Sequence, residues 1–218
     1  MNSSSRLLAL PLSLVGAFVF SSCGTTSIPT DPTKPEEIAK AENPHPAGSY
    51  EAFKWKTYPG TTRTWKSESL LATANATNTN VKIDIGDQRG FLMVRDQVAM
   101  DYRVSTGRRN KYDTPTGKFR ITEKIKDKRS NLYGKVLDAD GKVVKSNADS
   151  RKDEVPEGGK FLGTPMLHWM RLTNDGIGMH RGNVNSRFAS HGCIRSHYSA
   201  VPIVFAKTRI GTPVTVQP

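Results

Sequence analysis

Short runs in which apolar and polar residues alternate recur along much of the chain. An alternation with a period of two is typical of β-strands that bury one face, and polar turns separate most of these runs. The close spacing of the first three runs indicates a meander of antiparallel strands. The pattern predicts strands at Val81–Ile85, Phe91–Val94, Val98–Val104, Lys118–Thr122, Met166–Leu172, Gly176–His180 and Val214–Val216.

One segment near the C-terminus has the period of a helix instead. Within Ser196–Lys207, three apolar residues fall on one helical stripe. Proline is tolerated only in the first turn of a helix, so Pro202 predicts that the helix begins close to Ala200. The stripe consists of Val201, Val204 and Phe205.

Residues 126–164 interrupt the strand pattern with a polar, glycine-rich stretch. Within it, Val136–Val144 predicts a small hairpin that turns at Asp140-Gly141. Long insertions in compact domains are usually functional or mobile, so we expect this segment to be a lid over the functional site.

The region before the first strand is rich in Thr, Ser, Pro and charged residues from Gly24 to about Pro59. Such a composition is typical of a semi-extended spacer. Residues 50–78 are more aromatic than a pure linker, and we expect those aromatic side chains to pack on the domain. We therefore divide the chain into an N-terminal segment over residues 1–22, a spacer over residues 23–78 and a main domain over residues 79–218.

The first 22 residues read as an export signal. Arg6 gives a short positive region, and Leu7–Phe20 is uncharged and mostly apolar. This run is short for a membrane span. Small residues before Cys23 resemble the bacterial lipobox, although Phe20 departs from the usual aliphatic residue. The sequence predicts a periplasmic lipoprotein anchored through Cys23, with ordinary secretory cleavage as the alternative.

The net charge of +12 is scattered over the 218 residues rather than gathered in blocks. A scattered basic surface favours anionic partners such as lipid headgroups, wall polymers or nucleic acid. Export and the lack of a recognised binding motif argue against nucleic acid, so we expect none as a partner.

The chemistry of the chain centres on Cys193. It is the only cysteine besides Cys23, and it lies in Ser190–Arg195, a string that also contains His191 and Gly192. A thiol needs a neighbouring base to react near neutral pH, and either His180 or His191 can serve. The amides of Gly192 and Cys193 are candidates for an oxyanion hole.

Other interpretations of Cys193 remain open at this point. It could be an inert buried thiol, or pair with Cys23 in a disulfide. His168, His180, His191 and Cys193 lack the usual spacings of zinc ligands. A phosphatase loop needs arginine six residues after the cysteine, where this chain has Ser199. Papain-like enzymes place Cys before His, the reverse of the order here.

The string Ser190–Arg195, together with an upstream Gly-x-His, resembles the L,D-transpeptidase catalytic domain family (YkuD type). The resemblance covers about residues 80–217. Its most specific part is Ser-His-Gly-Cys, and the other motifs are supportive. These are Val104–Gly107, Thr114–Phe119, Gly178–His180 and Gly211–Val214.

The resemblance implies a mainly β, mixed sandwich-like fold with one short C-terminal helix, and action on peptidoglycan stem peptides. It also implies roles for individual residues. Cys193 would be the nucleophile and His180 the general base. His191, Gly192 and Ser190 would shape the oxyanion site, and Arg195 would position the loop or a substrate carboxylate.

The implied reaction releases D-Ala, forms an acyl-thioester and ends in a 3→3 crosslink. We expect neither a metal nor a cofactor. The alternatives are an L,D-carboxypeptidase and a non-catalytic wall-binding lipoprotein. Arg181 departs from the small residue common after the base in this family, and the span from His180 to Ser190 is short.

Overall fold

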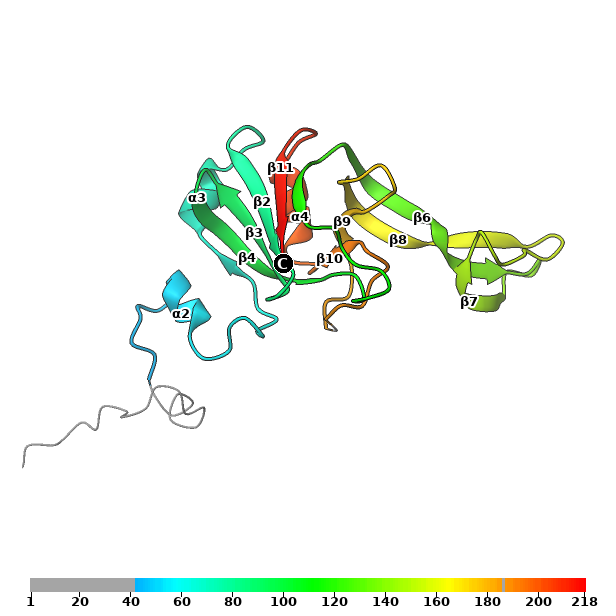
Figure 1. The fold of residues 1–218 in the computed structure, drawn as a ribbon, viewed down its shortest axis with the longest axis horizontal. Coiled ribbons are helices and arrows are strands. Elements are labelled where there is room, and N and C mark those ends of the chain that lie inside the picture. Colours follow the sequence, from blue (N-terminus) through cyan, green and yellow to red (C-terminus); the bar gives the residue numbers. More distant parts are fainter. Residues whose placement is uncertain (1–41, 186) are drawn as a thin grey trace, which may run out of the picture. The chain divides into compact units, whose positions relative to one another are not determined.

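The strands form one mixed sheet, which confirms the mainly β architecture (Figure 1). The computed structural model describes residues 42–185 and 187–218, so the predicted signal, Cys23 and the start of the spacer lie outside the described residues. Neighbouring strands are antiparallel except where β11 lies beside β2 and β10 beside β9. The order across the sheet is β5-β11-β2-β3-β4-β10-β9-β8-β6-β7, with β1 paired to β4. The strands are β1 (Trp65–Lys66), β2 (Thr79–Asp84), β3 (Arg89–Val94), β4 (Gln97–Ser105), β5 (Gly117–Arg120), β6 (Glu123–Leu137), β7 (Val143–Asp149), β8 (Lys160–Arg171), β9 (Gly178–Arg181), β10 (Ile194–Ser196) and β11 (Pro213–Gln217).

The predicted C-terminal helix is α4 (Val201–Lys207), which begins directly after Ala200 and carries Pro202 in its first turn. Two short helices precede β2, α2 (Tyr50–Lys54) and α3 (Glu68–Thr73), and β1 lies between them. In each, a serine hydroxyl accepts a bond from a backbone amide of the first turn, as is common at helix N-termini. Within residues 42–185 and 187–218, no helix is both long and apolar enough to cross a membrane.

Residues 43–78 belong to the same unit as the sheet, although the sequence pattern placed them in the spacer. The expectation that their aromatic side chains pack on the domain is confirmed. Phe53 is buried, and the rings of Tyr50 and Trp65 lie 4.7 Å apart. This segment covers one face of β4, and residues 99–105 are therefore buried on both faces of that strand.

Beneath this cover lies an ion pair that is fully buried. The Arg89 Nε lies 2.7 Å from the Asp101 Oδ1, and neither side chain is exposed to solvent. The Tyr50 hydroxyl donates to the other oxygen of Asp101 at 2.7 Å, and Arg89 also donates to the carbonyl of Thr61. Buried charges are tolerated only when paired and hydrogen-bonded, so the segment and β3–β4 depend on each other.

The insertion is more regular than its sequence indicates. β6 and β8 pair along much of their length, and Figure 1 shows them running together away from β2–β4, with β7 at the far end. The predicted hairpin is confirmed, since β6 and β7 pair and Gly141 takes a φ of 79° in the turn. β6 exposes much of its surface, so no apolar period marks it in the sequence.

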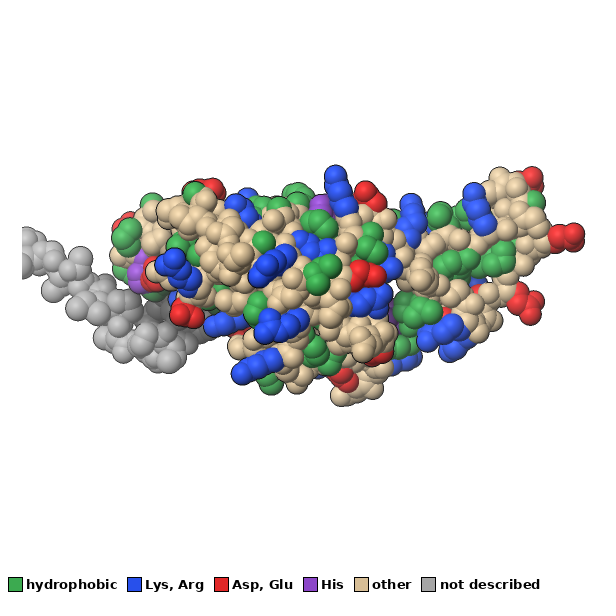
Figure 2. All heavy atoms as spheres, turned by 90° about the horizontal axis from the view of Figure 1, so that it is seen from above, with side chains coloured by type: hydrophobic (Ala, Val, Ile, Leu, Met, Phe, Trp, Pro, Cys, Tyr) green, Lys and Arg blue, Asp and Glu red, His purple; other side chains and the backbone are tan. Residues whose placement is uncertain are grey.

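Positive charge is distributed over the surface, as the sequence predicts. Figure 2 shows Lys and Arg side chains spread across the visible face without a single large block.

We predict that Arg89→Met lowers the free energy of unfolding by about 3–5 kcal/mol, because Asp101 stays buried without its partner. Urea denaturation followed by tryptophan fluorescence measures the change. Lys145→Met is the matched control: it removes the cation of a surface pair whose lysine is 53% exposed, and we expect little change. If the two variants lost equal free energy of unfolding, the stabilising role of the buried Arg89–Asp101 pair would be contradicted.

Candidate active site

The pairing of the short strand β10 with β9 brings the side chains of Cys193 and His180 to one face of the sheet. β10 runs parallel to β9, with Ile194 opposite Met179 and Arg195 opposite His180. Ile194 and Met179 are fully buried in the core, so residues one position away point to the other face. Cys193 directly precedes β10 and therefore shares its face with Arg195 and His180. The predicted approach of His180 to the thiol from a neighbouring strand is consistent with this pairing.

Cys193 is a free, partly buried thiol. Its Sγ lies 3.7 Å from the carbonyl oxygen of Gly176. Burial raises the pKa of Cys193, while a hydrogen bond from the Gly178 amide and the charges of Arg195 and Arg171 act in the opposite direction. The thiol form therefore prevails near neutral pH, and reaction needs a base.

His180 is buried, with 8% of its surface exposed. Its Nδ1 lies 2.7 Å from the Arg181 carbonyl oxygen, which requires a proton on Nδ1 and leaves Nε2 as an acceptor. Burial lowers the pKa of His180 to about 4, with the Arg195 charge adding to the effect, although the Arg181 carbonyl opposes it. The imidazole is therefore neutral and able to accept a proton.

The bond to Arg181 also explains how the chain tolerates arginine after the base. The group that orients His180 is a backbone carbonyl, which any residue supplies, and the Arg181 side chain is exposed. Within the described residues, no hydrogen bond joins His180 to the Cys193 sulfur. Catalytic hydrogen bonds are often long without substrate, and they shorten in the reacting complex.

Hydrogen bonds within the loop before Cys193 fix its conformation. The Ser190 hydroxyl donates to the Cys193 carbonyl at 2.5 Å and accepts from the Gly192 amide at 3.1 Å. Gly192 has a φ of +104°, a conformation that side chains disfavour. The buried Thr114 hydroxyl donates to the Gly192 carbonyl at 2.7 Å and accepts from the Gly107 amide. Because the Gly192 amide already has an acceptor, the Cys193 amide is the better oxyanion candidate of the two.

His191 points into a different environment from His180. Its Nε2 lies 2.8 Å from a guanidinium nitrogen of Arg108, and its ring contacts Tyr112 and Tyr133. His191 is exposed, but partial desolvation still lowers its pKa, and the charge of Arg108 lowers it further. These contacts favour a neutral ring that is fixed in place.

The four candidate zinc ligands do not converge. The His168 ring packs against Phe205, at a centroid distance of 5.3 Å, while His191 is bound by Arg108. Among the residues that the structure describes, no three His, Cys, Asp or Glu side chains are placed to hold a metal ion.

Two open pockets adjoin the site. One, of about 450 Å³, is lined by Gly107 and Thr114, which contact the Gly192 loop. The other, of about 480 Å³, is lined by Arg181 and Gly182, which directly follow His180. Neither pocket is lined by Cys193 or His180 themselves.

Several residues around the site were not singled out from the sequence. Thr114 occurred only as part of a turn motif, and Arg108, Tyr112 and Tyr133 carried no signal at all. Tyr133 is 58 residues from His191 and reaches it only through the long β6–β8 pairing. Of these residues, only Thr114 lies in a sequence motif, the turn at Thr114-Pro115, that indicates a special position.

Comparison with known proteins gives a consistent result. Residues 78–216 match the family model described as the L,D-transpeptidase catalytic domain (YkuD). No curated protein matches the chain.

Three of the similar solved structures illustrate the likeness. An L,D-transpeptidase from Mycobacterium smegmatis is 22% identical, with a TM-score of 0.47; the match covers 65% of this chain and 59% of that one. L,D-transpeptidase 1 from Mycobacterium tuberculosis is 19% identical, with a TM-score of 0.45 and coverage of 65% and 60%. The ertapenem-acylated catalytic domain from Enterococcus faecium is 24% identical, with a TM-score of 0.44 and coverage of 64% and 97%. This chain thus spans less than two thirds of the two mycobacterial chains.

We predict that alkylation of Cys193 by iodoacetamide accelerates with pH up to and beyond about pH 9, since burial raises the pKa of the thiol. Mass spectrometry of the peptide that contains Cys193 gives the rate separately from any reaction at Cys23. In Arg195→Gln the rate at a given pH should fall, because a charge that stabilises the thiolate is lost. A plateau below about pH 8 would contradict this prediction.

Proposed function

The chain belongs to the L,D-transpeptidase family, and we propose that it joins peptidoglycan stem peptides through 3→3 crosslinks, using Cys193 as the nucleophile. One observation carries the proposal: the parallel pairing of β9 and β10 sets a free thiol and a buried neutral imidazole on one face. This combination suits acyl transfer, because the base is unprotonated and the nucleophile retains its proton until it attacks.

In the proposed first half-reaction, the His180 Nε2 takes the proton from Cys193 while the sulfur attacks the carbonyl of the third stem residue. The negative charge that develops on the carbonyl oxygen is stabilised by the Cys193 amide. The tetrahedral intermediate collapses when the bond to D-Ala breaks, and His180 returns the proton to the departing amine. The products are free D-Ala and an acyl-thioester on Cys193.

In the second half-reaction, the side-chain amine of an acceptor stem attacks the thioester. His180 removes a proton from that amine, the carbon–sulfur bond breaks, and the proton passes to the sulfur. The new amide is the crosslink, and the thiol is regenerated. Arg195, whose charge acts to lower the pKa of Cys193, would attract a substrate carboxylate.

We favour transfer to an amine over transfer to water because the matching family model describes L,D-transpeptidases. A transpeptidase must hold both a donor and an acceptor peptide. An L,D-carboxypeptidase needs only the donor and a water molecule. A purely wall-binding protein has no need for a thiol beside a neutral imidazole.

We also propose that the protein is exported and tethered to a membrane through lipidated Cys23. Support comes from the sequence alone, since the apolar Leu7–Phe20 run and Cys23 lie outside the described residues. Each buried acyl methylene would contribute about 0.8 kcal/mol to such an anchor. A site that faces the wall would then meet peptidoglycan directly.

We predict that the protein, incubated with disaccharide-tetrapeptide, releases D-Ala and forms dimers that are visible by mass spectrometry. Cys193→Ala should abolish both products. His180→Ala should slow them about 100-fold or more, because the general base is lost. His45→Ala, which alters a half-buried histidine that contacts Trp55 rather than the site, is the matched control and should be unaffected.

Other outcomes of this experiment discriminate between the alternatives. Release of D-Ala without dimers would identify a carboxypeptidase. If the wild-type protein gave neither product, and a carbapenem added no mass to Cys193, the catalytic proposal would be rejected in favour of wall binding.

We further predict that kcat/KM is nearly constant between about pH 5 and about pH 8. His180, with a pKa of about 4, is neutral throughout this window, and the raised pKa of Cys193 keeps the thiol protonated. In His180→Ala only pre-formed thiolate can react, so the residual rate should rise about tenfold per pH unit. A wild-type inflection near about pH 6.5 would show an ordinary histidine instead.

A further inference from the structure

The inserted hairpin contains a local departure from regular pairing that places one tyrosine beside the active-site loop. The register between β6 and β8 shifts between Arg129 and Gly134, and Ser130–Tyr133 leave the ladder. The Ser130 hydroxyl accepts from the amides of Leu132 and Tyr133, which closes this excursion into a turn.

Two glycines make the excursion possible. A Cβ atom on Gly163 would lie 1.9 Å from the Ser130 carbonyl oxygen, and one on Gly134 would lie 2.3 Å from the Leu162 carbonyl oxygen. The two strands therefore approach more closely here than residues with side chains allow. The close backbone contacts at the two glycines therefore stabilise the excursion.

Tyr133 projects from this excursion onto His191. The two rings are stacked, with centroids 4.4 Å apart and planes inclined by 20°. Tyr112 meets the same imidazole edge-on, also at 4.4 Å. His191 directly precedes Gly192 and Cys193, so these tyrosines contact the loop that carries the thiol.

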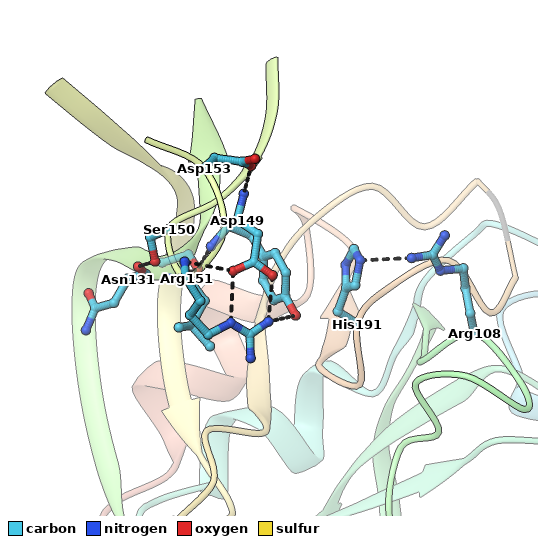
Figure 3. A network of polar contacts seen from close by, with 10 residues as sticks. Arg108, Asn131, Asp149, Ser150, Arg151, Asp153 and His191 are labelled. Carbon is cyan, nitrogen blue, oxygen red and sulfur yellow. Dashed lines mark hydrogen bonds and ion pairs between the residues drawn. The ribbon is translucent and has the colours of Figure 1, made fainter. Parts of the chain in front are cut away.

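The end of β7 and the residues that follow it anchor Tyr133. Arg151 donates two hydrogen bonds to the Asp149 carboxylate, at 2.9 and 2.7 Å, and one to the Tyr133 hydroxyl at 3.2 Å. The Ser150 hydroxyl donates to the Asn131 carbonyl at 2.7 Å, and the Asp153 carboxylate accepts from the Asp149 amide. Figure 3 shows this network on one side of His191 and Arg108 on the other.

Arg108 determines which nitrogen of His191 carries the proton. A guanidinium can only donate, so the Nε2 that lies 2.8 Å from it must be the acceptor, and the proton resides on Nδ1. The contacts of His191 therefore specify both the ring's orientation and its tautomer.

We propose that Tyr133 is a positioning residue for His191, held by Arg151 and Asp149, and that the inserted hairpin exists in part to supply it. This inference rests on the proposed function, because its consequence for the reaction runs through the loop that carries Cys193. A stacked partner restricts the rotation of the imidazole, and small displacements beside a reacting group are costly to rate.

Three variants of the full chain test the proposal with disaccharide-tetrapeptide as substrate. Tyr133→Ala removes the stack and should lower kcat about 10- to 100-fold, with a smaller change in KM. Tyr133→Phe keeps the ring and should stay within about threefold of wild type. Arg151→Gln removes both the bond to the Tyr133 hydroxyl and the ion pair with Asp149, the cross-strand partner of Tyr133, without altering a buried group, so its kcat should fall between those of the other two variants.

Leu132→Ala is the matched control, since Leu132 is 38% exposed and adjoins Tyr133 in the excursion. Its kinetics should equal those of wild type. The proposal is overturned if Tyr133→Ala matches wild type, or if Tyr133→Phe loses as much activity as Tyr133→Ala. Should Tyr133→Ala fail to fold, Arg151→Gln decides: a kcat equal to wild type overturns the proposal.

A second readout does not depend on turnover. Nitrogen chemical shifts of the His191 imidazole distinguish the two tautomers, and wild type should show a proton fixed on Nδ1. Tyr133→Ala should shift these signals, whereas Tyr133→Phe should preserve them. If wild type shows no catalysis but the shifts respond as expected, the proposed function fails and the positioning role stands. Unchanged shifts in Tyr133→Ala overturn the positioning role.

Discussion

One three-residue strand links the two halves of the sheet in the described part of the chain. β10, Ile194–Ser196, pairs with β4 on one side and with β9 on the other, so the strand order passes through it from one half to the other. Ile194 is fully buried at this junction, so core packing fixes the position of β10 as well as its register. The residue before it is Cys193. The contacts that hold β10 in the sheet therefore also determine the position of the Cys193 thiol.

A second constraint acts on β4, the other neighbour of β10. Asp101 and Arg89 lie on the face of the sheet that residues 50–63 cover, and burial raises the pKa of Asp101 against the effect of Arg89. Without that cover, two charged groups would meet solvent and the face would lose its aromatic packing. The segment that resembles a spacer in composition is in this respect a structural part of the domain.

The sequence predicts those elements that depend on neighbouring residues in the chain. The alternation of apolar and polar residues predicts β2–β4, and the proline predicts where α4 begins; both predictions are confirmed. β10 is too short to show a period, and β6 is too exposed to show an apolar one. The orientation of His180 depends on a carbonyl, for which residue type carries no signal. Tyr133 meets His191 through a register shift, which no spacing in the sequence encodes.

The charge of the chain has a further consequence at the two ends of the sheet. β5 and β7 are its edge strands, and unpaired edges invite pairing with other polypeptides. Lys118 lies within β5 and Lys145 within β7, and both are exposed. Burying a lysine ammonium against a second strand is costly, so each edge resists extension. Part of the excess of basic residues therefore protects the protein from aggregation, apart from any attraction to an anionic partner.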